Sequence, residues 1–375
     1  MTGVKILSSR QLAGRIAPAV LAVALAAAGC GPSSPGFRLN TDGRRPAEIT
    51  QVQQQAIAVA LQKLFGETDD PNLPDGVDLK LALLQHAAGA VRIDTAGNQL
   101  GLYRQHCSMC HALTGDGAGS TASVQNPYPR DFRQGWFKYT STAGGAKPLG
   151  KDLERILQQG VASTAMPAFN RLAEDEILAL VEYVKYLSIR GETELYLLQL
   201  VIDEDAYLPL DMDEVIEDGV LPAAESWTAA NQMKVHPAAG PEDPSQQLLA
   251  SIGRGRELFL SKEAQCLQCH GRRGNGRGDQ SELYDDWNKP KKGSTPQQTR
   301  LQARLFRLPI QRLRPRDFTR GVFRGGSRPE DICLRIHVGI KGTPMPAGGP
   351  APGTAGALKP EQISDVANYV RSLSR

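Results

Sequence analysis

The motif Cys-X-X-Cys-His occurs twice in this chain of 375 residues, at Cys107–His111 and again at Cys266–His270. Two thiols at this spacing can each bond one vinyl group of a haem, and the histidine that follows can bind the iron. Met166 and Met345, each followed by proline, lie downstream of the two motifs. A thioether there can bind the opposite face of the iron, and His/Met ligation raises its reduction potential. The pattern therefore predicts two covalently attached haem c groups.

The chain repeats the surroundings of the motif as well as the motif itself. The matched positions are Asp152 and Asp331, Gly160 and Gly339, Met166 and Met345, and the identical Pro-Arg-Asp-Phe stretches at 129–132 and 315–318. The aspartate lies 14 residues before the methionine in both copies, whereas Met109 and Met233 have no counterpart. This internal duplication predicts two similar domains and selects Met166 and Met345 as the distal ligands.

Apolar residues at helical spacing predict helices over residues 48–65, 77–88 and 172–188, and the predicted fold class is mostly α. A chain of this length has room for two domains of ordinary size. The predicted parts are a signal peptide at 1–30, a tether and N-terminal helical extension at 31–96, a first haem domain at 97–190, an acidic linker at 191–245, and a second haem domain at 246–375 with a basic insertion at about 271–314.

The N-terminus has the features of an export signal. Lys5, Arg10 and Arg15 make it positive, and the apolar run 16–28 is too short to span a bilayer comfortably. The run leads through Ala-Ala-Gly to Cys30, which resembles a bacterial lipobox and predicts lipidation of Cys30. In the alternative interpretation, cleavage is ordinary and Cys30 is an incidental thiol. With lipidation we expect the protein on the periplasmic side of a bacterial membrane, and with ordinary cleavage we expect it in the periplasm, because haem c is attached outside the cytoplasm.

Charge is balanced overall but distributed unevenly along the chain. The formal net charge of +3 indicates no nucleic-acid partner. The insertion at about 271–314 is basic, however, and the linker at 191–245 is acidic. Either these segments are two solvated surfaces, or the linker folds across the insertion, or the insertion docks an acidic redox partner. Docking of that kind speeds encounter and weakens with salt.

Taken together, the motifs, the Met-Pro loops and the C-terminal helices resemble a tandem dihaem cytochrome c with two class I domains, over about residues 97–189 and 250–375. The resemblance implies a mostly helical fold in which an N-terminal and a C-terminal helix cross beside each haem. It also implies that one edge of each haem reaches the surface. The site residues that it implies are Cys107, Cys110, Cys266 and Cys269 as thioether attachment sites, His111 and His270 as proximal ligands, and Met166 and Met345 as distal ligands.

The same resemblance implies residues that tune the haem sites. A backbone carbonyl, often on a proline, orients the proximal histidine in this family, and Pro129 and Pro315 are the candidates. Arg130 and Arg316 are expected to pair with haem propionates, because a guanidinium fits a carboxylate at two points. In the alternative interpretation they are surface arginines.

Some chemistry-bearing residues receive no role in haem binding. His337 precedes Met345 by eight residues, but its counterpart in the first copy is Gln158, which predicts a helix-surface histidine. Cys333 is predicted to be a packing thiol. His86, His106 and His236 are not expected to be ligands.

Two six-coordinate irons favour an electron carrier over an enzyme, because catalysis at iron needs an open coordination position. The predicted function is therefore one-electron transfer between membrane-associated redox partners. Three alternatives stay open: a dihaem peroxidase, a sulfur-compound dehydrogenase, and the cytochrome subunit of a larger respiratory complex.

Overall fold

The computed structural model of the chain describes residues 36–43, 48–203, 208–237, 246–285 and 288–374. These residues are mostly helical, and the strands among them are the short antiparallel pair β1 (Arg92–Ile93) and β2 (Gln99–Leu100). The predicted fold class is therefore confirmed. Cys30 and the predicted signal peptide lie outside the described residues. Within the described ranges, no helix is both long enough and apolar enough to cross a membrane.

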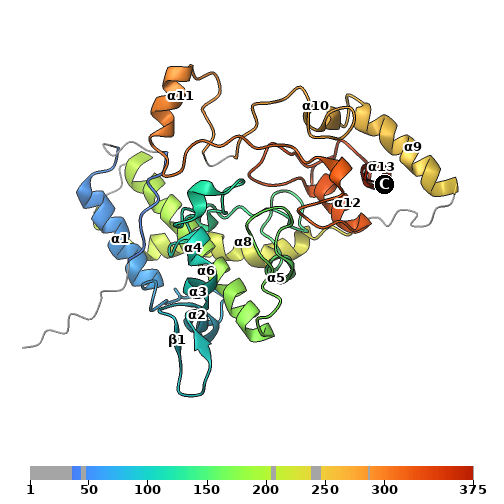
Figure 1. The fold of residues 1–375 in the computed structure, drawn as a ribbon. Coiled ribbons are helices and arrows are strands. Elements are labelled where there is room, and N and C mark those ends of the chain that lie inside the picture. Colours follow the sequence, from blue (N-terminus) through green and yellow to red (C-terminus); the bar gives the residue numbers. More distant parts are fainter. Residues whose placement is uncertain (1–35, 44–47, 204–207, 238–245, 286–287, 375) are drawn as a thin grey trace, which may run out of the picture. The chain divides into compact units, whose positions relative to one another are not determined.

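The first half of the described chain, residues 36–237, is built around one long helix, α6 (Glu174–Asp203) (Figure 1). Helices α1 (Gln51–Phe65), α2 (Leu81–Ala87) and α5 (Gly150–Gln159) and the 3-10 helix η3 (Phe132–Gln134) all contact it. The other helical elements of this half are α1 (Gln51–Phe65), α2 (Leu81–Ala87), α3 (Leu102–His106), α4 (Ser108–His111), η2 (Ala122–Val124), η3 (Phe132–Gln134), α5 (Gly150–Gln159), α7 (Met212–Glu214), the π-helical η4 (Val215–Val220), α8 (Leu221–Ala229) and η5 (Ala230–Met233).

The N-terminal helical extension packs on the first core. The helix predicted over 48–65 is α1, which begins where the Thr50 hydroxyl accepts a hydrogen bond from the backbone N–H of Gln53 at 3.2 Å. The Gln53 side chain accepts in return from the N–H of Thr50, so both partners of a capping box are present. Ile57 and Leu61 on the inner face of α1 are fully buried. The helix predicted over 77–88 is the shorter α2.

Helix α6 continues well past residue 188, where the sequence predicted its end. The apolar face continues with it, because Leu197 and Val201 are buried in the same core as the earlier turns. Gly191 allows the close packing of α6 on η3, since a Cβ at this position would lie 2.3 Å from the Cα of Arg133. The predicted end at residue 188 was wrong, because the apolar face of the helix continues through Leu197 and Val201.

The segment predicted as an acidic linker, 191–245, is largely helical. It contains the last part of α6 and the continuous helical stretch from α7 to η5. Val215 and Val220 in this stretch are fully buried and belong to the core of the first half. Much of the segment is therefore part of the first folded unit.

The second half, residues 246–374, has a hydrophobic core of its own. Phe259, Phe318, Ile332 and Val366 are among its buried residues, and none of them belongs to the core of the first half. Its helical elements are α9 (Gln246–Leu260), α10 (Cys266–His270), α11 (Pro296–Ala303), η6 (Phe318–Arg320), α12 (Pro329–Val338) and α13 (Pro360–Ser372).

Helices α9 and α13 cross in direct backbone contact. A Cβ at Gly255 of α9 would lie 1.9 Å from the carbonyl oxygen of Asp365 on α13. The Asp365 carboxylate also accepts hydrogen bonds from Ser251 at 2.6 Å and from Arg254 at 2.8 Å. An N-terminal and a C-terminal helix thus cross in the second half.

Candidate haem sites

Each Cys-X-X-Cys-His motif forms one turn of helix. In the first half the backbone N–H of His111 donates to the carbonyl of Cys107 at 2.9 Å, which closes α4. In the second half the motif is α10, and it begins after Gln265, whose φ of +54° lies in the left-handed region. Residues three and four apart on a helix share one face. The turn therefore gathers the two cysteines and the histidine of each motif.

The four motif cysteines are free thiols, as is Cys333. Cys107 is buried, and burial raises the pKa of its thiol to about 12. Burial also raises the pKa of Cys266, to about 11. Neither motif closes on itself as a disulfide, so each sulfur is available for a bond to a cofactor.

The ring of His111 is fixed from two sides. Its Nδ1 donates to the backbone carbonyl of Arg130 at 2.9 Å, and the ring stacks on Phe132 with 4.5 Å between the centroids. Burial lowers the pKa of His111 to about 4, so the ring is neutral at neutral pH. A neutral imidazole with its proton on Nδ1 presents the lone pair of Nε2 to a metal.

His270 is held in the same way in the second half. Its Nδ1 donates to the backbone carbonyl of Arg316 at 3.2 Å, and its ring stacks on Phe318 with 4.4 Å between the centroids. Burial again lowers the pKa of the imidazole. The two histidines thus have equivalent partners within the repeated Pro-Arg-Asp-Phe stretches.

The predicted carbonyl partners, Pro129 and Pro315, were each wrong by one residue. The carbonyl of Pro129 faces Gly117, where a Cβ would lie 2.7 Å from it, and the carbonyl of Pro315 faces Gly276 at 2.6 Å. The glycine loop after each motif therefore occupies that side of the proline. The following carbonyl, on the arginine, is the one that points at the histidine.

Met166 lies on a loop that is held by its own backbone. The N–H of Val161 donates to the carbonyl of Met166 at 3.1 Å, and the N–H of Met166 donates to the Thr164 hydroxyl at 3.1 Å. Gly160 opens the loop with a φ of +66°, and a Cβ there would lie 2.7 Å from the backbone of Pro167. Glycine is therefore required at this position.

The loop of Met345 has the same bonds at the same offsets. The N–H of Ile340 donates to the carbonyl of Met345 at 3.1 Å, and the N–H of Met345 donates to the Thr343 hydroxyl at 3.3 Å. Gly339 has a φ of +69°, and a Cβ there would lie 2.6 Å from the backbone of Pro346. The two methionine loops therefore have the same backbone hydrogen bonds and the same glycine at their start.

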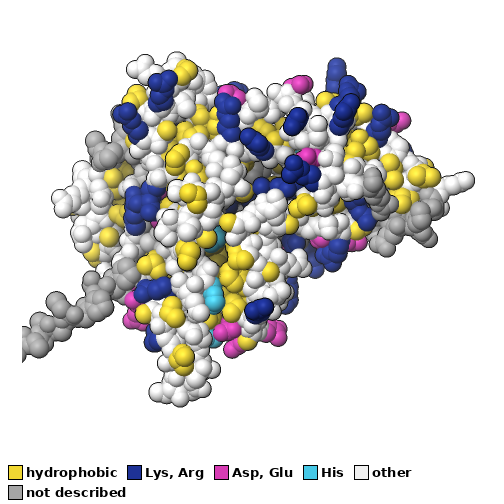
Figure 2. All heavy atoms as spheres, in the orientation of Figure 1, with side chains coloured by type: hydrophobic (Ala, Val, Ile, Leu, Met, Phe, Trp, Pro, Cys, Tyr) yellow, Lys and Arg dark blue, Asp and Glu magenta, His cyan; other side chains and the backbone are white. Residues whose placement is uncertain are grey.

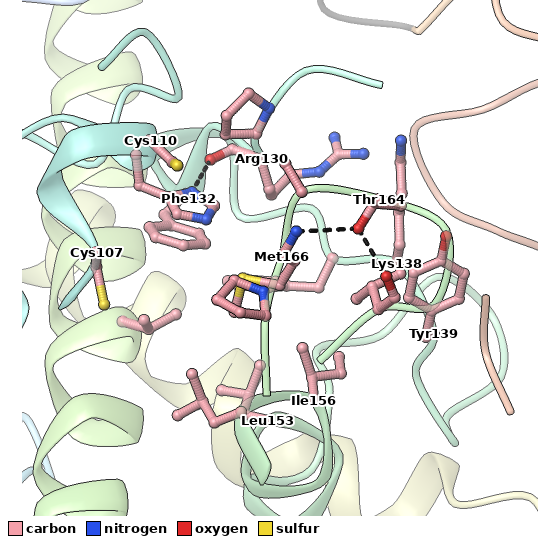
Figure 3. Close-up of a pocket in the computed structure, with 18 of the residues that line it drawn as sticks. Cys107, Cys110, Arg130, Phe132, Lys138, Tyr139, Leu153, Ile156, Thr164 and Met166 are labelled. Carbon is pink, nitrogen blue, oxygen red and sulfur yellow. Dashed lines mark hydrogen bonds between the residues drawn. The ribbon is translucent and has the colours of Figure 1, made fainter. Parts of the chain in front are cut away.

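The first half contains a cavity of about 1110 Å³, counted with the open space at its mouth (Figure 3). Cys107, Cys110, His111 and Met166 all line it, so the structure brings the predicted residues of the first site to one place. The rest of the wall is mainly apolar and includes Phe132, Phe137, Leu153, Ile156, Leu157, Val181 and Val184. A large apolar space with a few fixed polar groups is typical of a cofactor site.

Cations line the side of the cavity that lies away from Cys107. Figure 3 shows Lys138 and Tyr139 there, with the Arg130 side chain directed toward them. The Nε and Nη1 atoms of Arg130 are buried and have no hydrogen-bond partner in the part of the chain that the structure describes. A buried guanidinium with unused donors suits a carboxylate. The cavity therefore fits haem c, with thioether sites at one end and room for the propionates at the other.

Three of the other four histidines contact groups that have no part in the predicted ligand sets. His337 Nε2 lies 2.8 Å from the carbonyl of Pro350, and His86 Nε2 lies 2.6 Å from the carbonyl of Gln99. His106 lines the cavity, but its ring contacts the edge of Phe169.

Sequence reasoning missed Thr164 and Thr343, whose hydroxyls hold the methionine loops. Each lies two residues before its methionine, so the count that matched the repeats already contained the signal. It also missed Lys138 and Tyr139, although Lys138 follows Phe137 at the position where Arg324 follows Phe323 in the second copy.

Comparisons with known proteins agree with this geometry. Residues 96–184 match the family model described as cytochrome C oxidase, cbb3-type, subunit III. The fold is similar to a chain of the Kuenenia stuttgartiensis reducing HAO-like protein complex, with a TM-score of 0.51 and 22% identity over 76% of this chain and 100% of that chain. No curated protein matches the chain. The chain thus contains a cytochrome c domain at 96–184, which supports a haem-dependent role in electron transfer.

Proposed function

We propose that this chain is an exported dihaem cytochrome c that carries single electrons between membrane-associated redox partners. Haem c supplies the reversible one-electron change of its iron. The residues assigned to it are Cys107, Cys110, Cys266 and Cys269 for covalent attachment, His111 and His270 as proximal ligands, and Met166 and Met345 as distal ligands.

The observation that carries the proposal is the recurrence of one set of contacts in both halves. Each motif histidine donates to an arginine carbonyl and stacks on a phenylalanine, and each methionine loop is closed by a threonine hydroxyl. The family match covers the first copy alone. The second copy is assigned a haem because its contacts are the same.

The contribution of the protein to electron transfer is to fix the orientation of the side chains proposed as ligands. The carbonyl bond fixes the ring orientation of His111, and the Thr164 bond fixes the backbone of Met166. The walls that α5 and α6 contribute to the first cavity are apolar, with Leu153, Ile156 and Leu157 from α5 and Val181 and Val184 from α6. If His111 and Met166 both bind the iron as proposed, the haem would have no open coordination position for a substrate and would pass electrons only.

We further propose that Cys30 is lipidated and anchors the chain on the periplasmic side of a bacterial membrane. The neighbour of similar fold belongs to a two-protein complex. This favours a second role, in which the chain is the cytochrome subunit of a larger complex. Co-purification with a membrane oxidoreductase separates that role from a free carrier.

The basic insertion offers a surface for an acidic partner. Arg307 pairs with Asp116 of the first half, and Gln311 donates to the carbonyl of Gln125 at 2.8 Å, so the insertion lies along the first half. Figure 2 shows Lys and Arg side chains over α11 and the loops beside it. Besides Arg307, the exposed basic residues of the insertion are Arg272, Arg273, Arg277, Lys289, Lys291, Lys292, Arg300, Arg304, Arg312 and Arg314. Electron exchange through this face should slow as salt rises.

A redox titration of the purified protein with optical detection tests the proposed function. We expect two one-electron haems, each with the weak methionine–iron band at the red end of the spectrum. Slow binding of carbon monoxide is expected as well. Rapid carbon monoxide or cyanide binding by one haem, or turnover of peroxide, would instead assign the chain to the dihaem oxidoreductases.

A further inference from the structure

Cationic side chains from both halves gather around Tyr139: burial raises the pKa of its hydroxyl, and the nearby charges of Arg324, Arg130, Arg335 and Arg316 oppose that rise. Arg335 of α12 donates to the carbonyl of Thr140, and its guanidinium lies 5.8 Å from the centre of the Tyr139 ring. Arg155 of α5 donates in the opposite direction, to the carbonyl of Gly325 in the second half at 3.1 Å. Arg155 also donates to the carbonyl of Tyr139 at 3.0 Å and lies 4.0 Å from the carboxylate of Asp152. We call Arg130, Lys138, Arg316, Arg324 and Arg335 the cation cluster.

Four members of the cation cluster are equivalent positions of the two repeats. Arg130 matches Arg316, as the residues whose carbonyls hold the histidines. Lys138 matches Arg324, because Lys138 follows Phe137 and Arg324 follows Phe323. Each of these phenylalanines stacks on the phenylalanine that contacts the motif histidine. The centroid distances are 6.1 Å for Phe132 and Phe137, and 5.9 Å for Phe318 and Phe323. Each half therefore places two cationic side chains, at equivalent positions, near Tyr139.

Asp285 is the carboxylate that contacts the cation cluster directly among the described residues, while Asp152, Asp331 and Asp317 act on it from farther away and are bonded to other groups. Asp285 accepts from Arg130 at 3.5 Å and lies 3.1 Å from the amine of Lys138. Arg335 is 8% exposed, and its Nε and Nη1 have no hydrogen-bond partner among the described residues. The same holds for Nε of Arg324.

Uncompensated cations are costly where water is excluded. The cost shows in Lys138, whose pKa burial lowers to about 8, and in Arg335, whose pKa burial lowers to about 10. Buried guanidinium groups with free donors call for carboxylates that approach in their plane. Arg130 is a guanidinium of this kind, and it lies at the end of the first cavity where haem propionates fit.

We propose that the cation cluster binds the propionates of both haems, so that the two cofactors turn the same edge toward Tyr139 and their reduction potentials are coupled there. The inference rests on the proposed dihaem function. In the folded holoprotein, Arg324 and Arg335 of the second half act on the first haem as well as on their own. A positive charge held near a haem favours its reduced form, so each member of the cluster raises both midpoint potentials.

The test is a redox titration of holoprotein variants with optical detection. Arg324→Gln removes one charge without removing a hydrogen bond of Arg324 that the structure shows. Arg324→Lys keeps the charge and copies the lysine at the equivalent position 138. Arg300→Gln removes one exposed charge from α11 and serves as the matched control.

We expect Arg324→Gln to lower both midpoint potentials. A tenfold change in a one-electron equilibrium corresponds to a shift of about 59 mV. Arg324→Lys and Arg300→Gln should titrate like the wild type. The inference is overturned if Arg324→Gln shifts one potential or neither, or if Arg300→Gln shifts both as much. It is also overturned if added phosphate shifts the wild-type potentials and leaves Arg324→Gln unchanged, since the cluster would then bind a free oxyanion.

Counting haems separates this failure from failure of the proposed function. Two covalent haems per chain with unmoved potentials would refute the shared propionate site alone. A wild-type chain with fewer than two covalent haems would refute the dihaem proposal, and the inference with it.

Discussion

A methyl group added at Gly255 should separate the helices that frame the second site. The Cβ of an alanine at this position would lie 1.9 Å from the carbonyl oxygen of Asp365 and 3.0 Å from the Cβ of Tyr369. The nearest obstacle is helix backbone, which cannot rotate away as a long side chain can. Helices α9 and α13 must therefore move apart, and the bonds of Ser251 and Arg254 to Asp365 must lengthen.

Two opposing effects set the size of the change. Alanine gains about 1 kcal/mol over glycine inside a helix. Overpacking a tight contact costs about 1–3 kcal/mol, and a backbone obstacle at 1.9 Å places Gly255→Ala at or above the upper end of that range. We expect a net loss of about 2 kcal/mol in the free energy of unfolding.

Gly253→Ala is the matched control. Gly253 lies on the same helix, is exposed, and has nothing within 4 Å of the position of an added Cβ. This variant should therefore gain stability by up to about 1 kcal/mol. Urea unfolding of the holoprotein, followed by haem absorbance and by circular dichroism, measures both variants. A Gly255→Ala protein as stable as the wild type, or a Gly253→Ala protein equally damaged, would refute the helix contact.

Three further predictions address the haem sites and the remaining thiol. Met166→Ala should open the distal position of the first haem, with loss of part of the red-end methionine band and gain of carbon monoxide binding by one haem; an unchanged spectrum would remove Met166 as a ligand. Cys333 is 3% exposed, so iodoacetamide should modify it only after denaturation, and mass spectrometry should then find the four motif cysteines unmodified. Burial raises the pKa of Cys333 above its ordinary value of 9.0, so the unfolded chain releases this proton first. Stability should therefore fall as pH rises above about 9, more steeply in the wild type than in Cys333→Ser.

Spacing in the sequence predicted which residues of the first half lie together. Cys107, Cys110 and His111 share one helical turn, and the position of Met166 followed from an interval that both repeats keep. Such features are local or are counted along one chain, so no tertiary information was needed. The capped helix after Thr50 was predictable for the same reason.

Contacts that depend on close backbone packing could not be predicted. The choice of the Arg130 carbonyl over that of Pro129 follows from how tightly the Gly117 loop packs, which no periodicity reveals. The extension of α6 through Gly191 has the same origin, because glycine there serves packing instead of ending the helix. The cation cluster joins residues from both halves and becomes visible only in three dimensions.

The central claim is that each half of the chain binds one haem through two thioether bonds. The most direct measurement is the mass of the mature protein after full denaturation, together with its haem content per chain. The account predicts two haem groups that remain on the polypeptide after acid and organic solvent extraction. A chain with a single covalent haem, or a pigment that extracts into solvent, would contradict it.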